Sequence, residues 1–121
     1  MKIWKYSGLF LIITGIIHTA VGLMFGWSAH VEIIRAGLFN TIAQSIEHSY
    51  AFWFLICGFI IISFGQILHH YIKRDQRPAP LFFGYSMLIF AILGAIVIPV
   101  SGFWLFIPQA LIIIIANKKA S

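Results

Sequence analysis

The side chains of this sequence that could take part in chemistry are few, and three of them lie inside long apolar runs. His18 stands one helical turn after Thr14 in the run 7–27, and Gln109 follows a proline in the last run. Polar groups at such depth usually face a protein interior or a wet cavity, because lipid cannot hydrogen-bond to them. We therefore expect His18, Thr14 and Gln109 to line one interior, where they would bind a ligand or, at His18, exchange a proton.

Arg35 is the fourth candidate ligand-binding residue, because this cation falls among apolar residues when the segment 31–46 is plotted as a helix. An inward-turned Arg35 would meet a ligand held by His18. Two simpler interpretations stay open. In one, Arg35 pairs at the surface with Glu32, three residues before it. In the other, His18 is a neutral imidazole hydrogen-bonded to a neighbouring helix.

The remaining composition excludes several classes of reaction. The chain has 3 acidic residues, all near the ends of apolar runs, so acid–base chemistry has little to work with. Its single cysteine, Cys57, excludes an intramolecular disulfide and a Cys-x-x-Cys redox centre. His18 would lie about 16 Å from the membrane boundary and His69 and His70 within about 5 Å, so two axial haem ligands do not meet. We expect no cofactor and no metal, and the sequence leans against an enzyme.

The elements that must position these residues are membrane spans. Of the residues, 61% are hydrophobic and 9% charged, which is far outside the range of soluble domains. The pattern predicts an all-α membrane protein, a four-transmembrane-helix bundle in a single membrane domain over 1–121. Its spans lie at about 7–27, 50–72, 81–100 and 103–116, against the roughly 20 residues that a bilayer requires. The last is short, so we expect the connection 99–102 to lie below the lipid headgroups.

Between the first two spans, apolar residues repeat at intervals of three and four: Val31, Ile34, Leu38, Ile42 and Ile46. This spacing predicts an amphipathic helix at about 31–46, in the long outer loop, that lies on the membrane surface or folds over the bundle.

Small residues predict close helix packing. Glycines repeat every seven residues in the first two spans: Gly8, Gly15 and Gly22, then Gly58 and Gly65. Where lipid supplies no hydrophobic drive, small residues let helix backbones approach. We expect most of this seam to hold the bundle together, and the rest to contact other copies in a homo-oligomer.

The net charge of +5 is explained by membrane topology and does not indicate a nucleic-acid partner. All basic residues except Arg35 cluster on one side of the predicted spans: Lys2, Lys5, Lys73, Arg74, Arg77, Lys118 and Lys119. The positive-inside rule then places both the N and C termini in the cytoplasm. We predict a multi-pass protein of a bacterial cytoplasmic (inner) membrane, whose partner is the lipid bilayer and which binds no nucleic acid.

Three stretches carry a resemblance to a known family. They are Gly15, His18 and Gly22 in the first span, residues 51–54 with Gly58, Gly65 and Gln66 in the second, and residues 99–109 at the last hairpin. With these the chain resembles a family of uncharacterised small bacterial four-helix integral membrane proteins, and its layout is similar to that of DoxX-like proteins. The resemblance covers nearly the whole chain and implies the fold, but it supplies no activity and no catalytic residue.

Three functions fit the sequence. We rank first a binding or accessory protein with an outer-leaflet pocket for a lipid-like or small amphipathic ligand, contacted by His18, Arg35, Gln109 and Thr14. The second is a small oligomeric exporter that uses His18 for proton coupling. The third is a structural subunit of a membrane complex, for which the glycine seam suffices.

Overall fold

The computed structural model describes residues 2–99 and 102–120. In chain order the elements are η1 (Ile3–Tyr6), α1 (Ser7–Phe25), α2 (Trp27–Arg35), η2 (Ile42–Gln44), α3 (Ile46–Asp75), α4 (Leu81–Val97), η3 (Gly102–Leu105) and α5 (Phe106–Ala120). The described part of the chain contains helices and no strand, so the predicted all-α class is confirmed.

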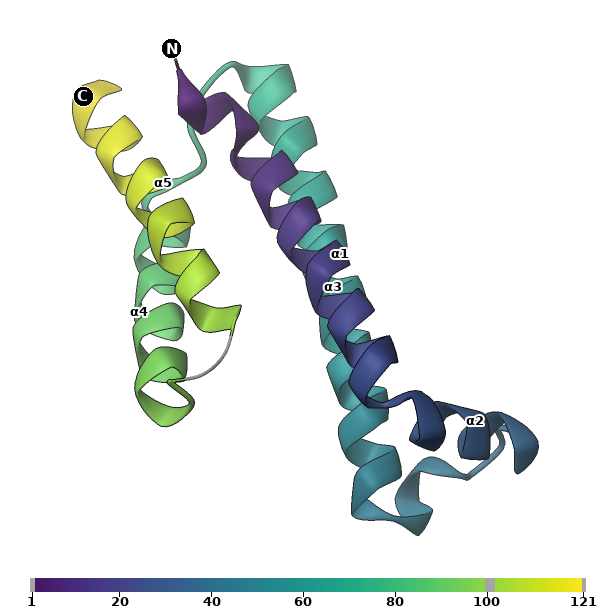
Figure 1. The fold of residues 1–121 in the computed structure, drawn as a ribbon. Helices are drawn as coiled ribbons and strands as arrows, with labels where there is room; N and C mark the ends of the chain where they lie inside the picture. The colour runs from purple at the N-terminus through teal and green to yellow at the C-terminus, as the bar shows by residue number, and fades with distance from the viewer. Residues whose placement is uncertain (1, 100–101, 121) are drawn as a thin grey trace.

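The long helices form two antiparallel hairpins (Figure 1). One pairs α1 with α3, the other pairs α4 with α5, and α5 also contacts α1. The two chain termini and the α3–α4 loop lie at one end of the molecule, which we call the terminal end (Figure 1). The short helix α2 lies at the opposite end, called here the α2 end.

Among the described residues, three helical segments are long and apolar enough to cross a membrane: Ile3–Phe25, Ile46–Asp75 and Gly102–Lys119. Helix α4, with 17 residues, is shorter and reaches about 26 Å, against about 30 Å for a hydrocarbon core. The short element is therefore α4 and not the run 103–116, because that run begins in η3 and its helix continues to Ala120. The fold is compatible with a helical membrane protein.

The connection between α4 and α5 was expected to lie below the lipid headgroups. Val100 and Ser101 of this connection lie outside the described residues. On either side of them, the Trp104 indole N–H donates to the Pro99 carbonyl at 2.7 Å. This bond ties η3 to the end of the preceding helix, so the flanks of the turn are held close together.

The glycine seam between α1 and α3 is confirmed. A Cβ added at Gly15 would lie 2.6 Å from Ile62 Cγ1 and 2.8 Å from the Ile62 backbone nitrogen. A Cβ at Gly65 would lie 2.7 Å from the Ile12 backbone nitrogen. Only glycine leaves room for backbones this close, so these residues set the spacing of the first hairpin.

Apolar side chains divide between a small core and a large exposed surface. The core joins the two hairpins and includes Leu11, Leu68, Ile72, Met87, Phe106 and Ile113. Elsewhere large apolar side chains point outward; Phe25 is 84% exposed and Phe82 is 73% exposed. A soluble monomer rarely exposes so much apolar surface, whereas lipid-facing helices do.

The amphipathic helix predicted over 31–46 is wrong beyond Arg35. The helix α2 begins earlier, at Trp27, and ends at Arg35. Gly37, Leu38 and Asn40 then adopt positive φ angles of 92°, 68° and 54°, which no right-handed helix contains. Glycine and asparagine tolerate this region, and the Thr41 hydroxyl donates to the Leu38 carbonyl at 2.9 Å, which holds the turn. The helical spacing of apolar residues continues through this turn, so the sequence pattern alone did not reveal it.

Candidate functional site

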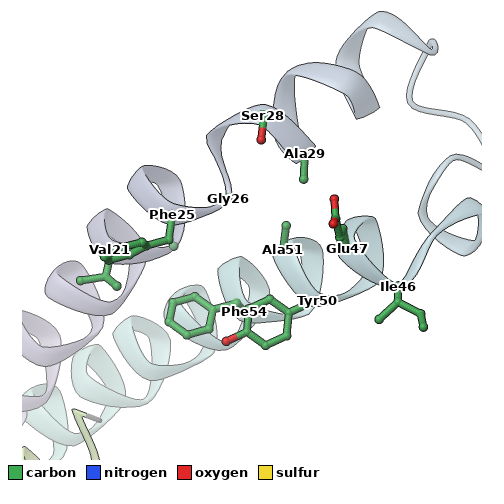
Figure 2. Close-up of a pocket in the computed structure, with 11 residues that line it drawn as sticks. Val21, Phe25, Gly26, Ser28, Ala29, Ile46, Glu47, Tyr50, Ala51 and Phe54 are labelled. Atoms are coloured by element: carbon green, nitrogen blue, oxygen red, sulfur yellow. The ribbon is translucent and has the colours of Figure 1, made fainter. Parts of the chain in front are cut away.

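A groove with a volume of ≈ 390 Å³ opens between α1, α2 and α3 at the α2 end (Figure 2). We call it the α2 groove. Its lining combines small, aromatic and polar residues: Val21, Gly22, Phe25, Gly26, Ser28, Ala29, Ile46, Glu47, Tyr50, Ala51 and Phe54. It lies where the chain leaves the α1–α3 hairpin and turns into α2.

The groove exists because α1 ends at Gly26. The Gly26 N–H donates to the Gly22 carbonyl at 2.9 Å, and the Gly26 carbonyl accepts from the His30 N–H at 2.9 Å. A Cβ at Gly26 would lie 2.9 Å from the Gly22 carbonyl oxygen and 3.2 Å from Ala51 Cβ. The chain can therefore change direction here against α3, and the small residues along the bend leave space that larger side chains would fill.

The groove has aromatic walls and a single acidic group. Phe25, Tyr50 and Phe54 line it, and the rings of Tyr50 and Phe54 lie 6.0 Å apart. Figure 2 shows the Glu47 carboxylate pointing from α3 toward α2. Glu47 lies in the first turn of α3, where the helix dipole favours its negative charge. None of the described lining residues is a cation, so the groove suits an apolar molecule with a positive or hydrogen-bond-donating head.

His18 lies behind the wall of the groove. Its ring nitrogen Nε2 lies 3.0 Å from the Phe54 carbonyl, which can only accept, so Nε2 donates. The two rings are stacked, with centroids 3.9 Å apart and an angle of 11°. This is the hydrogen bond to a neighbouring helix that one interpretation of His18 expects. His18 therefore fixes the position of Phe54, which lines the groove.

Thr14 and Gln109 meet between the two hairpins. The Gln109 side-chain amide donates to Thr14 Oγ1 at 2.8 Å and to the Leu105 carbonyl at 3.0 Å. The Thr14 hydroxyl in turn donates to the Phe10 carbonyl at 2.8 Å. Both side chains are buried, and no described residue donates to Gln109 Oε1. The pair thus joins α1 to α5 through a polar contact inside an apolar interface.

Arg35 does not turn inward. It is the last residue of α2 and is exposed, and the structure pairs Glu32 with His48 instead. The four predicted site residues are therefore not brought into one pocket. Thr14 and Gln109 contact each other, His18 contacts α3, and Arg35 lies at the surface; the groove lining includes none of them.

A histidine that the sequence did not single out holds α2 in place. His48 Nε2 lies 2.9 Å from Glu32 Oε2, and its Nδ1 lies 3.0 Å from the Thr41 carbonyl. We call these three residues the His48 clasp. The His48 N–H donates to Ser45 Oγ, the N-cap of α3, at 3.0 Å. The clasp joins the end of α2 and the following turn to the start of α3, beside the groove.

The sequence did not predict the groove residues, because their spacing along the chain follows no recognisable pattern. Gly22 was assigned to the predicted glycine seam, and the aromatic residues Tyr50 and Phe54 lie at the start of the second predicted span with no spacing that sets them apart. A bend at Gly26 turns both features into the walls of one groove, and the bend depends on tertiary contacts. Within residues 2–99 and 102–120, no three His, Cys, Asp or Glu side chains gather as a metal site.

Comparison with known proteins identifies the family without an activity. No curated protein and no solved structure matches the sequence. One family model, described as "Family of unknown function (DUF6463)", matches residues 2–120, which is nearly the whole chain. The protein belongs to this family of unknown function.

Proposed function

We propose that this protein is a small membrane-embedded binding or accessory protein, and that its α2 groove holds an amphipathic molecule with a cationic head. The observation that carries the proposal is the groove itself, with three aromatic side chains and one carboxylate, Glu47, on its lining. Aromatic faces attract cations, most strongly where water is scarce, and a carboxylate adds charge complementarity. The apolar part of the ligand would lie against Val21 and Phe25.

The proposed setting follows from the distribution of charge. The basic residues other than Arg35 lie at or near the terminal end, which favours a cytoplasmic location for both termini in a bacterial inner membrane. In that orientation four helices span, in the layout that resembles DoxX-like proteins. The α2 groove then opens at the level of the outer leaflet, where amphipathic molecules are concentrated.

The other two functions have less support. For an exporter, the proton-coupling group would be His18, but its Nε2 is engaged with the Phe54 carbonyl and its ring is stacked. For a structural subunit, the glycine seam would contact a partner, but Gly15 and Gly65 already pack against α3 and α1 of the same chain. The binding function uses a feature that these contacts leave open.

The test is ligand binding by native mass spectrometry, with hexyltrimethylammonium as the probe and neutral hexyl glucoside as the matched amphiphile. We expect the wild-type protein to retain the cation in preference to the glucoside. Glu47→Gln should lower retention of the cation several-fold, because it removes the charge and keeps the shape. Asp75→Asn is the control, since it removes one negative charge at the terminal end.

Two results would contradict the proposal. One is equal retention of the cation and the glucoside by the wild-type protein. The other is equal loss of the cation in Glu47→Gln and Asp75→Asn, which would show a response to net charge and not to the groove.

A further inference from the structure

A second pocket, with a volume of ≈ 960 Å³, lies at the terminal end, between η1, the α3–α4 loop and α5. Three cations line it: Lys2 directly before η1, Arg77 in the α3–α4 loop and Lys119 in α5. The described lining contains no acidic residue. Cations gathered around one cavity repel one another, and an anion bound among them would relieve that repulsion.

The loop that carries Arg77 is held in position by hydrogen bonds and prolines. The Asn117 side-chain amide donates to the Ala79 carbonyl at 2.8 Å, and Ala79 is fully buried. Pro78 and Pro80 flank Ala79 and restrict the backbone on both sides. This arrangement keeps Arg77 on the same cavity as Lys119 before any ligand binds, so little ordering cost remains.

The only acidic residue near the pocket in sequence is already engaged. Asp75 accepts from Arg74 Nε at 2.8 Å, and this pair lies outside the lining. The chain has 3 acidic residues, and the other two, Glu32 and Glu47, lie in α2 and at the start of α3, at the opposite end. Asp75 lies near enough to Arg77 for their charges to interact, but no acidic residue of the described lining offsets the positive charge of Lys2, Arg77 and Lys119 inside the pocket.

The remaining lining suits a lipid and not only an ion. Ile3, Ile112 and Ile115 are apolar, while Trp4 and Tyr71 are residue types that sit at membrane–water interfaces. Basic pockets between helices at this level recognise phosphate-bearing headgroups, with the acyl chains against apolar helix surface. We infer that this pocket binds the phosphodiester headgroup of an anionic lipid, with Lys2, Arg77 and Lys119 around the phosphate.

The experiment compares lipid retention by native mass spectrometry after purification in a neutral detergent. The probes are dioleoyl phosphatidylglycerol and dioleoyl phosphatidylcholine, which share acyl chains and differ in net charge. We expect the wild-type protein to prefer phosphatidylglycerol. The double variant Arg77→Gln with Lys119→Gln should lose about tenfold or more of that preference, since each cation near an anionic headgroup contributes substantially. The matched control is Lys5→Gln with Lys73→Gln, which removes the same charge at the same end but outside the pocket.

Each outcome decides the inference. Loss in the pocket variant with retention in the control supports it. No preference in the wild-type protein, or equal loss in both double variants, overturns it. Inorganic phosphate in excess is added to the lipid complex as a competitor. If it displaces phosphatidylglycerol and a phosphate adduct remains, the pocket binds a free anion, and the assignment to a lipid headgroup is overturned. If the double variant fails to fold, Lys2→Gln, directly before η1, provides the same test.

Discussion

At the scale of single residues, His18 and His48 both hold neighbours in position, but they do so in different ways. His18 donates one hydrogen bond, to the Phe54 carbonyl, and stacks on the Phe54 ring. His48 faces an acceptor at each ring nitrogen, the Glu32 carboxylate and the Thr41 carbonyl. The difference matters because a neutral imidazole carries one N–H and can satisfy His18, whereas only the protonated ring satisfies both partners of His48.

The role of His18 predicts a graded effect on ligand binding. His18→Ala removes both the hydrogen bond and the stacking that fix Phe54, so affinity for hexyltrimethylammonium should fall about fivefold, as expected when a net interaction on the order of 1 kcal/mol is lost. His18→Phe keeps an aromatic ring in that place and should lose less. Native mass spectrometry at several probe concentrations measures both. Equal losses in the two variants would indicate that His18 contacts the ligand directly.

The His48 clasp predicts a pH-dependent turn. The hydrogen bond with Glu32, and then that with the Thr41 carbonyl, raise the pKa of His48 above its usual value of about 6.5. Both bonds therefore form below that value, and the clasp loses a donor as the pH rises through the raised pKa. Glu32 from α2 and Glu47 from α3 are the acidic residues beside this ring, and both favour the protonated form. Hydrogen exchange in residues 36–44, corrected for the intrinsic effect of pH, should therefore be slower at about pH 6 than at about pH 8.

Glu32→Gln supplies the matched comparison for the clasp. It keeps a hydrogen-bonding side chain at the end of α2 but removes the charge that favours the protonated His48 ring. Protection of residues 36–44 should then depend much less on pH. His70→Ala, at the terminal end, should keep the full dependence. A turn that exchanges at the same corrected rate at both pH values in the wild-type protein would rule out the clasp as a pH-dependent contact.

At this scale the sequence predicted interior positions for polar side chains, but none of these side chains lines the α2 groove. It placed Thr14, His18 and Gln109 in an interior, because polar groups deep in apolar runs have few other places to go. It could not assign their partners, since Thr14 meets Gln109 across α1 and α5 while His18 meets Phe54 on α3. Arg35 was placed inward by a helical wheel that continued through a turn. Which face a residue presents depends on where its helix ends.

At the scale of the helices, the contact between the two hairpins depends on few polar groups. Gln109 and Thr14 form a buried hydrogen bond across it. In membrane proteins such bonds contribute about 0.6 kcal/mol on average and up to about 1.7. A double-mutant cycle of Thr14→Val and Gln109→Leu, followed by thermal unfolding in detergent, should give a coupling of that size. Additive effects would show that the bond contributes nothing to holding the hairpins together.

Within the first hairpin, the glycine seam predicts a sharp contrast between two glycine-to-alanine changes. Gly15→Ala would place a Cβ 2.6 Å from Ile62 Cγ1 and 2.8 Å from its backbone nitrogen, so α1 and α3 must separate. We expect destabilisation of about 1–3 kcal/mol, as for overpacked cores. Gly102→Ala meets nothing within 4 Å and should be close to neutral. Thermal unfolding of both variants checks the seam, and equal melting temperatures would contradict it.

The presence of the long helices could be predicted from the sequence, but some of the residues at which helices end could not. The apolar runs at 7–27 and 50–72 correspond to α1 and α3 because length and hydropathy alone identify such segments. The helix over 31–46 failed because the turn at Gly37 and Asn40 keeps the apolar spacing of its surroundings. The bend at Gly26, which creates the groove, has no local signal beyond a glycine next to an aromatic residue.

At the scale of the whole molecule, the direction of each helix limits the number of spans. The chain runs away from the terminal end along α1 and returns to it along α3 (Figure 1). Helix α5 also ends at the terminal end, so the chain must first travel away from that end again to reach the start of α5. Helix α4 is the only described helix that can carry it there. Its 17 residues are short for a span, so α4 would cross a bilayer only with a sunken connection to α5 or where the bilayer is locally thinner.

This reasoning predicts that both termini face the same side of the membrane. In a Cys57→Ser background, Lys5→Cys and Lys119→Cys should react with a membrane-impermeant maleimide only after cells are lysed. Leu38→Cys, in the exposed turn after α2, should react in intact cells. If α4 did not cross the membrane, three spans would place the termini on opposite sides, and Lys119→Cys would react in intact cells while Lys5→Cys would not. The same labelling decides whether the α2 groove faces the outside, where the proposed amphipathic cation would meet it.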